Sequence, residues 1–123
     1  RAQAVKREAE EKLCGACVEV TTLQQLHGDV DLLCNGTPVG MTPHPEGCPV
    51  GREVLSRTAA VFDAIYNPAR TRLLQLAEAE GARTLGGMPM LVWQAAVAQE
   101  IWNDVTYTPA QVQRVIEQME ELL

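Results

Sequence analysis

The sequence holds one turn at which the main chain itself could bind a ligand. Asp31 to Met41 reads Asp-Leu-Leu-Cys-Asn-Gly-Thr-Pro-Val-Gly-Met, so a short apolar run passes directly into a polar segment with two glycines. Such a run is typical of a strand that is covered on both faces. In open α/β sheets ligands lie beyond the carboxyl ends of the strands, and Gly36 and Gly40 would let a cofactor approach the backbone closely. The segment predicts a nucleotide site, but many strands that end in Gly and Pro lead only into ordinary loops.

Two cysteines three residues apart raise the alternative of metal chemistry. Cys14-Gly-Ala-Cys17 has the spacing of a zinc-binding or redox pair, and His44 and Cys48 would complete four ligands. The sequence has no second Cys-x-x-Cys pair, and Cys34 lies in a predicted buried strand. Small buried thiols explain this pattern as well as a metal does. We therefore expect reduced cysteines and no metal.

Three further polar side chains stand at the ends or in the middle of apolar segments. Tyr66 follows the apolar run Ala59 to Ala64, and Gln94 interrupts the stretch Met88 to Trp102. A buried amide needs hydrogen-bond partners, and a ligand hydroxyl could be one of them. Either residue could equally be structural, as a strand-end aromatic or as a satisfied core amide. Asp63 could be a general base, but a strand aspartate more often caps a turn, so we leave it out of the catalytic set.

An alternation of strands and helices must position these residues. The sequence predicts strands at Ala16–Val20, Val30–Cys34, Ala59–Ala64 and Arg83–Leu85. It predicts helices over Arg1–Leu13, Thr71–Glu80, Met88–Trp102 and from the capping box Thr108-Pro-Ala-Gln111 onwards. It also predicts a capped helical turn at Thr22–Gln25 and an irregular proline-rich loop from Pro43 to Pro49. Strand, helix and strand at this spacing form a crossover with parallel strands. The nearly all-apolar third helix must be buried or must await a partner surface.

Composition and charge exclude several functional classes. At 123 residues and 46% apolar content, the chain has the size of one domain with a core. A formal charge of -6 has the wrong sign for holding a phosphate backbone, so we expect no nucleic-acid partner. No apolar run approaches the ~20 residues that span a bilayer and no signal-like segment is present, so we expect a cytoplasmic protein without a membrane partner. Arg1 stands inside a helix already under way, which predicts a piece of a longer protein.

Three blocks of the sequence agree in order and spacing with one known family. They are Asp31 to Met41, Val61-Phe-Asp-Ala-Ile-Tyr-Asn-Pro68 with Thr71-Arg-Leu-Leu74, and Gly87-Met-Pro-Met-Leu-Val-Trp-Gln-Ala95. They resemble the C-terminal half of the shikimate dehydrogenase family, which usually has alanine at Gly36 and often leucine and glycine at Met88 and Pro89.

The resemblance implies an α/β fold, the C-terminal part of a doubly wound parallel sheet. Residues 1–87 would form a partial Rossmann-like NADP-binding domain that lacks its first two strands and its glycine-rich loop. Cys17–Val20 would be its third, outer strand, and the strands at Asp31, Ala60 and Arg83 its fourth to sixth. Residues 88–123 would form helices that pack back towards a missing N-terminal domain and contribute to the substrate cleft.

The resemblance also implies roles for single residues. Tyr66 and Gln94 fall where the family holds shikimate, through the phenol and the amide. Arg1 would close the family's basic motif for the 2′-phosphate of NADP, to which a guanidinium gives bidentate bonds. The other backbone turns would line the nicotinamide and ribose. The cofactor-binding residues implied are Arg1, Gly36, Thr37, Pro38, Ala64 and Gly87.

The implied function is that of a fragment of an NADP-dependent shikimate dehydrogenase, which reversibly reduces 3-dehydroshikimate to shikimate in the chorismate pathway to aromatic amino acids. The family's catalytic lysine and aspartate belong to the missing N-terminal domain, so the fragment alone is expected to be inactive. It is also expected to be marginally stable, with an unpaired strand edge and an exposed apolar helix. Two alternatives stay open, a non-catalytic nucleotide-binding or helical interaction module on this scaffold and a small Cys/His metal-binding domain.

Overall fold

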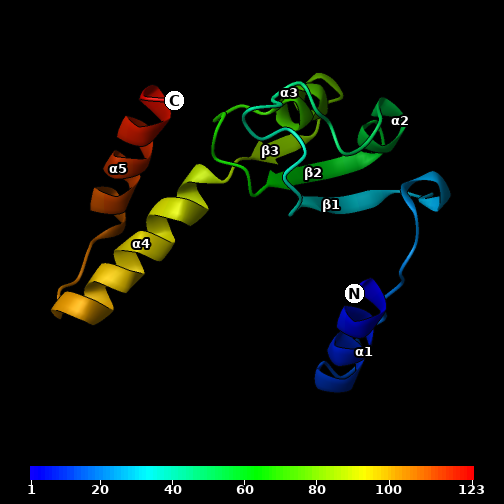
Figure 1. The fold of residues 1–123 in the computed structure, drawn as a ribbon, viewed down its shortest axis with the longest axis horizontal. Helices are drawn as coiled ribbons and strands as arrows, with labels where there is room; N and C mark the ends of the chain where they lie inside the picture. Colours follow the sequence, from blue (N-terminus) through cyan, green and yellow to red (C-terminus); the bar gives the residue numbers. More distant parts are fainter.

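A three-stranded parallel sheet forms the centre of the molecule (Figure 1). In the computed structural model, which describes residues 1–123, the strands are β1 (Val30–Asn35), β2 (Thr58–Asp63) and β3 (Arg83–Leu85). They lie in the order β1-β2-β3, with Asn35 opposite Asp63 and Phe62 opposite Leu85. All three strands therefore end at one edge of the sheet. The α/β class and the parallel pairing predicted from the sequence are confirmed.

Two helices cover one face of this sheet (Figure 1). They are α2 (Arg52–Leu55) and α3 (Arg72–Ala79), and α3 begins where the Thr71 side chain accepts the Leu74 amide. The core between helices and sheet consists of Leu55, Val61, Leu73, Leu74, Ala77 and Ala82. Helix α2 was not predicted from the sequence, because four residues are too few to show helical periodicity.

The opposite face of the sheet is open, which corrects one expectation. The continuous apolar run of β1 predicted burial on both faces, but Leu32 is 57% exposed and Cys34 is exposed as well. Leu85 on β3 is also 53% exposed. Side chains alternate between the two faces of a strand, and only the face under α2 and α3 carries a covering layer. No helix lies over the other face in Figure 1.

The first helix, α1 (Ala2–Lys12), stands apart from the sheet (Figure 1) and buries none of its residues. The strand predicted at Ala16–Val20 is wrong, since the segment belongs to no sheet. A strand needs a neighbour for its backbone hydrogen bonds, and none lies beside these residues. The helical turn predicted next is confirmed as the 3₁₀ helix η1 (Leu23–Gln25). Thr22 does not cap its backbone, because the hydroxyl donates to the Gln25 side chain at 3.1 Å instead.

The last two helices, α4 (Met88–Asn103) and α5 (Pro109–Glu121), pack on each other and project from the carboxyl edge of the sheet (Figure 1). Both hydrogen bonds of the predicted capping box at Thr108 and Gln111 are present. The interface between the helices is built around Met88, Val112 and Ile116. No helix of the chain combines the length and the apolar character that a membrane crossing requires.

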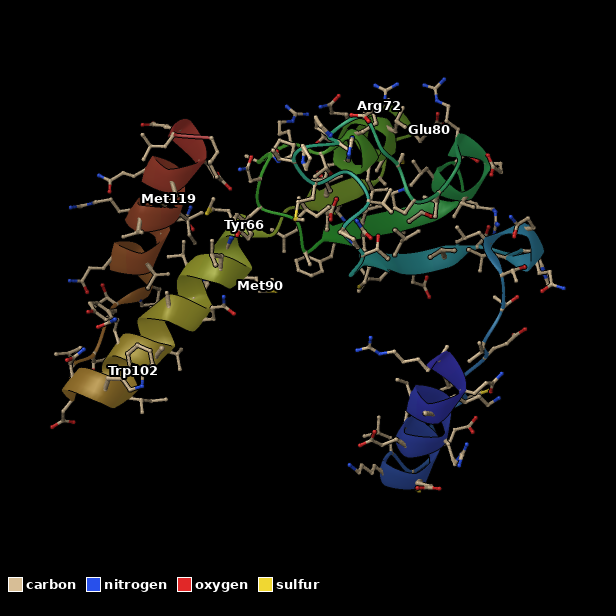
Figure 2. All side chains as sticks on the ribbon, viewed as in Figure 1. Tyr66, Arg72, Glu80, Met90, Trp102 and Met119 are labelled. Atoms are coloured by element: carbon tan, nitrogen blue, oxygen red, sulfur yellow. The ribbon has the colours of Figure 1, made fainter.

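The outer side of α4 is an exposed apolar surface. Ile101 and Trp102 are 76% and 74% exposed, and Trp93 and Val97 are more than two fifths exposed. Figure 2 shows Trp102 at the far end of α4 from the sheet. Of the two outcomes predicted for this helix, the structure shows the second, an apolar surface without a partner within residues 1–123.

This surface leads to a testable prediction for the 123-residue chain on its own. We expect the chain to enhance the fluorescence of a dye that binds exposed apolar surface, and to unfold over a broad thermal transition. Ile101→Ser with Trp102→Ser should lower the dye signal without lowering the free energy of unfolding by more than about 0.5 kcal/mol, since both side chains are exposed. The matched control is Leu122→Ser with Leu123→Ser at the C-terminus. A sharp transition without dye binding would contradict the prediction.

Candidate functional site

Three backbone turns meet at the carboxyl edge of the sheet. The first, residues 36–40, follows β1; the second, residues 64–66, follows β2; and the third, residues 86–87, joins β3 to α4. The Ala64 amide donates to the Asn35 carbonyl at 3.0 Å, and the Gly87 amide donates to the Ile65 carbonyl at 3.0 Å. The middle turn is therefore bonded to the end of β1 on one side and to the third turn on the other. Gly36, Thr37, Pro38, Ala64 and Gly87, which the sequence analysis singled out, lie in these three turns.

The buried carboxylate of Asp63 links the end of β1, the second turn and the start of α3 through hydrogen bonds. Asp63 is 0% exposed, and its Oδ1 accepts from Asn35 Nδ2 at 3.0 Å and from the Ile65 amide at 3.1 Å. Its Oδ2 accepts from Thr71 Oγ1 at 2.6 Å. Thr71 in turn caps α3 through the Leu74 amide at 3.4 Å. Both oxygens of Asp63 are occupied by donors of the chain itself, which agrees with its exclusion from the catalytic set.

Asn35 and Thr71 were not predicted from the sequence as partners of Asp63. The three residues lie 28 and 8 positions apart along the chain, so no spacing motif joins them. The sequence carries only a weaker signal for these contacts than a spacing motif would. Each is a polar residue at the end of a predicted strand or at a helix N-cap, and parallel strand ends meet at one edge.

The first turn is held by its own side chains. Asn35 Oδ1 accepts from the Thr37 amide at 3.0 Å and from the Thr37 hydroxyl at 2.7 Å. Gly40 has φ +99°, a conformation that favours glycine, and a Cβ there would come within 3.0 Å of the Gly47 carbonyl oxygen. A Cβ on Gly36 would meet no atom within 4 Å. The fold therefore requires glycine at position 40 but not at position 36.

The third turn approaches the second as closely as backbone allows. Gly87 is buried, and a Cβ at this position would collide with the carbonyl group of Ala64 and with the backbone of Ile65. The structure thus brings together Ala64 and Gly87, two predicted cofactor contacts that lie 23 positions apart in the sequence. Close packing of the chain against itself already explains the glycine at position 87.

The two predicted substrate residues lie at or beyond this edge and are open to solvent. Tyr66 is 44% exposed, and Figure 2 shows it near the first turn of α4 together with Met90. Gln94 follows Gly87 by seven positions, which is about two helical turns and ~10 Å along α4. The prediction of a buried amide at Gln94 is wrong, because no layer covers this part of α4 and the residue is exposed. Neither side chain makes a hydrogen bond within the chain, so both polar groups are free for a ligand.

Arg1 and the cysteine motif lie away from the edge. Arg1 is the N-cap of α1, which stands apart from the sheet (Figure 1), so the structure does not bring Arg1 to the other predicted cofactor residues. Cys14 and Cys17 are exposed beyond the other end of α1, and all four cysteines are free thiols. No group of three or more His, Cys, Asp or Glu side chains in residues 1–123 is placed to hold a metal ion. The metal-binding alternative therefore finds no support in the structure.

Comparison with known proteins agrees with the family resemblance of the sequence. No family model matches the chain. A shikimate dehydrogenase (NADP(+)) of Alkaliphilus oremlandii is 44% identical over 90 residues, which are 72% of this chain and 32% of that protein. One from Dehalococcoides mccartyi is 45% identical over 84 residues, 68% of this chain and 29% of that protein. The chain thus spans about a third of the length of the curated relatives it matches.

Solved structures show the same relationship. A chorismate mutase/shikimate 5-dehydrogenase fusion protein from Clostridium acetobutylicum superimposes with a TM-score of 0.74 at 39% identity, over 81% of this chain and 36% of that one. Shikimate 5-dehydrogenase from Thermus thermophilus, in complex with NADP(H) and shikimate, superimposes with a TM-score of 0.61 at 32% identity, over 72% of this chain and 33% of that one. A 5-ketofructose reductase of Gluconobacter superimposes with a TM-score of 0.61 at 36% identity, over 76% of this chain and 32% of that one. By sequence and by its Rossmann-like parallel sheet, the chain belongs to the shikimate dehydrogenase family.

Proposed function

We propose that this chain is the C-terminal, cofactor-binding part of an NADP-dependent shikimate dehydrogenase that reversibly reduces 3-dehydroshikimate to shikimate. Residues 1–87 form part of the dinucleotide-binding domain, and residues 88–123 form helices that face an N-terminal domain of the same protein and contribute to the substrate cleft. The observation that carries the proposal is the meeting of three hydrogen-bonded turns at the carboxyl edge of a parallel sheet. Relatives named for this activity at 44% and 45% identity support it.

The first turn fits the nicotinamide end of NADP. Gly36 is exposed, its missing Cβ leaves open space, and its amide makes no hydrogen bond within the chain. Pro38 has no amide hydrogen and presents an apolar ring beside it. A flat aromatic group could therefore lie against this backbone, bonded to the Gly36 amide. Ala64 and Gly87 would line the same cofactor from the neighbouring turns, and the cofactor, when bound, supplies the hydride.

The residues of this chain would bind and orient the reactants. Tyr66 and Gln94 carry free polar groups on the second turn and on α4, where they would bond the hydroxyl or carboxylate groups of shikimate. Arg1 would bond the 2′-phosphate of NADP if the rest of the protein holds α1 closer to the sheet. The lysine and aspartate that the family uses for proton transfer would come from the N-terminal domain. The 123-residue chain alone is therefore expected not to catalyse the reaction.

The function is tested by assaying the whole protein that contains this chain. We expect NADP-dependent oxidation of shikimate, followed by the absorbance of NADPH, and no reaction with the 123-residue chain alone. Binding of NADP without turnover would favour the alternative, a non-catalytic nucleotide-binding module. Turnover of 5-ketofructose in preference to 3-dehydroshikimate would favour the activity of the Gluconobacter neighbour on the same scaffold.

The substrate role of Gln94 is tested separately. In the whole protein, Gln94→Ala should raise the KM of shikimate about tenfold, because one hydrogen bond to a ligand contributes about 1.4 kcal/mol. The KM of NADP should stay unchanged. The matched control is Gln75→Ala on α3, whose side chain bonds only the Arg70 carbonyl. An unchanged KM of shikimate in Gln94→Ala would remove Gln94 from the site.

A further inference from the structure

The orientation of the Asn35 side chain is fixed by acceptors on one side and donors on the other. Asn35 Nδ2 faces Asp63 Oδ1 at 3.0 Å and the Val39 carbonyl oxygen at 3.4 Å. The same Asp63 oxygen already accepts the Ile65 amide at 3.1 Å. The group that faces these two oxygens must therefore be the NH2 of the amide. The carbonyl oxygen of Asn35 consequently points to Thr37.

This orientation determines what the Thr37 side chain can offer to a ligand. The hydroxyl of Thr37 donates its only proton to Asn35 Oδ1 at 2.7 Å. One of its lone pairs faces the Val39 amide at 3.3 Å. A hydroxyl has one donor and two acceptor positions, so a single acceptor position remains. Thr37 is exposed, and this position is open to a ligand at the edge of the sheet.

The remaining polar groups of the first turn determine which ligand atoms it can bond. The Thr37 amide is also used, since it donates to Asn35 Oδ1 at 3.0 Å. The Gly36 amide is free, and Pro38 has no amide hydrogen. The turn therefore presents one donor, Gly36 N–H, beside one acceptor, Thr37 Oγ1. A phosphate oxygen needs donors and finds none at the Thr37 hydroxyl.

We propose that Asn35 and Asp63 are positioning residues that hold the Thr37 hydroxyl as a hydrogen-bond acceptor for a donor group on the nicotinamide riboside end of the bound cofactor. The buried carboxylate of Asp63 orients the Asn35 amide, and the Asn35 carbonyl takes the proton of the Thr37 hydroxyl. This arrangement selects the nicotinamide riboside end of the dinucleotide, which carries N–H and O–H donors, for the first turn and keeps the phosphates away from Thr37. The inference rests on the proposed function, because it requires NADP at this edge.

The hydrogen bonds from Asp63 through Asn35 to Thr37 form a relay. A double-mutant cycle in the whole dehydrogenase tests this relay. Thr37→Val should raise the KM of NADP about tenfold, and Asn35→Ala should raise it by a similar factor. The double variant should raise the KM of NADP by that same factor, and not by the product of the two factors, since both substitutions remove the same contact with the cofactor. The KM of shikimate should not change. Thr37→Ser, which keeps the hydroxyl, should restore the KM of NADP.

Matched controls lie outside the site. Thr84→Val and Asn103→Ala remove side chains that bond only Glu78 and Gln99, and both variants should keep the KM of NADP of the unmodified protein. Should Asn35→Ala fail to fold, Asn35→Leu takes its place, because leucine is close to asparagine in size and has no polar group. It should raise the KM of NADP by the same factor as Thr37→Val.

Two results would overturn the relay in a protein that oxidises shikimate with NADP. One is a double variant in which the two factors multiply. The other is a KM for NADP that Thr37→Val raises but that Asn35→Ala, or Asn35→Leu in its place, leaves unchanged. A protein that does not oxidise shikimate with NADP would overturn the proposed function as well, so the two failures are distinguishable.

Discussion

Gly87→Ala is expected to lower the free energy of unfolding by about 3 kcal/mol and to abolish NADP-dependent turnover, because overpacking of this kind forces backbone to move. The added Cβ would collide with the carbonyl group of Ala64 and with the backbone of Ile65. These are backbone atoms of a turn that is bonded to β1 on one side and to Gly87 on the other, so no side chain can rotate away. Relief of the clash has to separate α4 from the second turn.

The matched control for this substitution is Gly36→Ala. A Cβ at this position would meet no atom within 4 Å, so the free energy of unfolding should change by less than about 0.5 kcal/mol. Urea unfolding of the two variants measures the difference. Equal unfolding midpoints for Gly87→Ala and the unmodified protein would show that the third turn does not approach the second as described.

Asp63→Ala is expected to lower the free energy of unfolding by about 4 kcal/mol, because each buried donor left without a partner costs about 1–3 kcal/mol. The donors that lose their acceptor are Asn35 Nδ2, the Ile65 amide and the Thr71 hydroxyl. They belong to three different segments, so the loss loosens all three at once. The effect should exceed that of an ordinary surface substitution several-fold.

Asp31→Ala is the matched control for the carboxylate. Asp31 lies on the same sheet and is exposed, and its side chain makes no hydrogen bond or ion pair within the chain. Its substitution should change the free energy of unfolding by less than about 0.5 kcal/mol. Similar losses for Asp31→Ala and Asp63→Ala would argue against the buried network as the element that holds β1, the second turn and α3 together.

Local patterns in the sequence were sufficient to predict the strands that form the sheet. Apolar runs followed by Gly, Pro or Asn mark the ends of β1 and β2, and short connections through a helix require parallel pairing. Parallel pairing in turn brings the predicted cofactor residues Thr37, Ala64 and Gly87 to one edge. This part of the site follows from topology and needs no side-chain detail.

Features that depend on distant partners were not predictable. Ala16–Val20 has the composition of a strand but has no neighbour to pair with, and Gln94 and Cys34 look like buried residues but have no layer above them. Burial is a property of two surfaces, and the sequence of one surface does not specify the other. The Asp63 network was missed for a related reason, because its hydrogen bonds join segments that are adjacent only after the sheet has formed.

The central claim is that the carboxyl edge of this sheet is where the dinucleotide and the substrate meet. A crystal structure of the whole protein with NADP and shikimate tests it most directly. We predict the nicotinamide ring against the backbone of residues 36–38 and Gly87, and shikimate within hydrogen-bond distance of Tyr66 and Gln94. A nicotinamide bound at any other edge or face of the sheet, with these residues free of ligand, would contradict the claim.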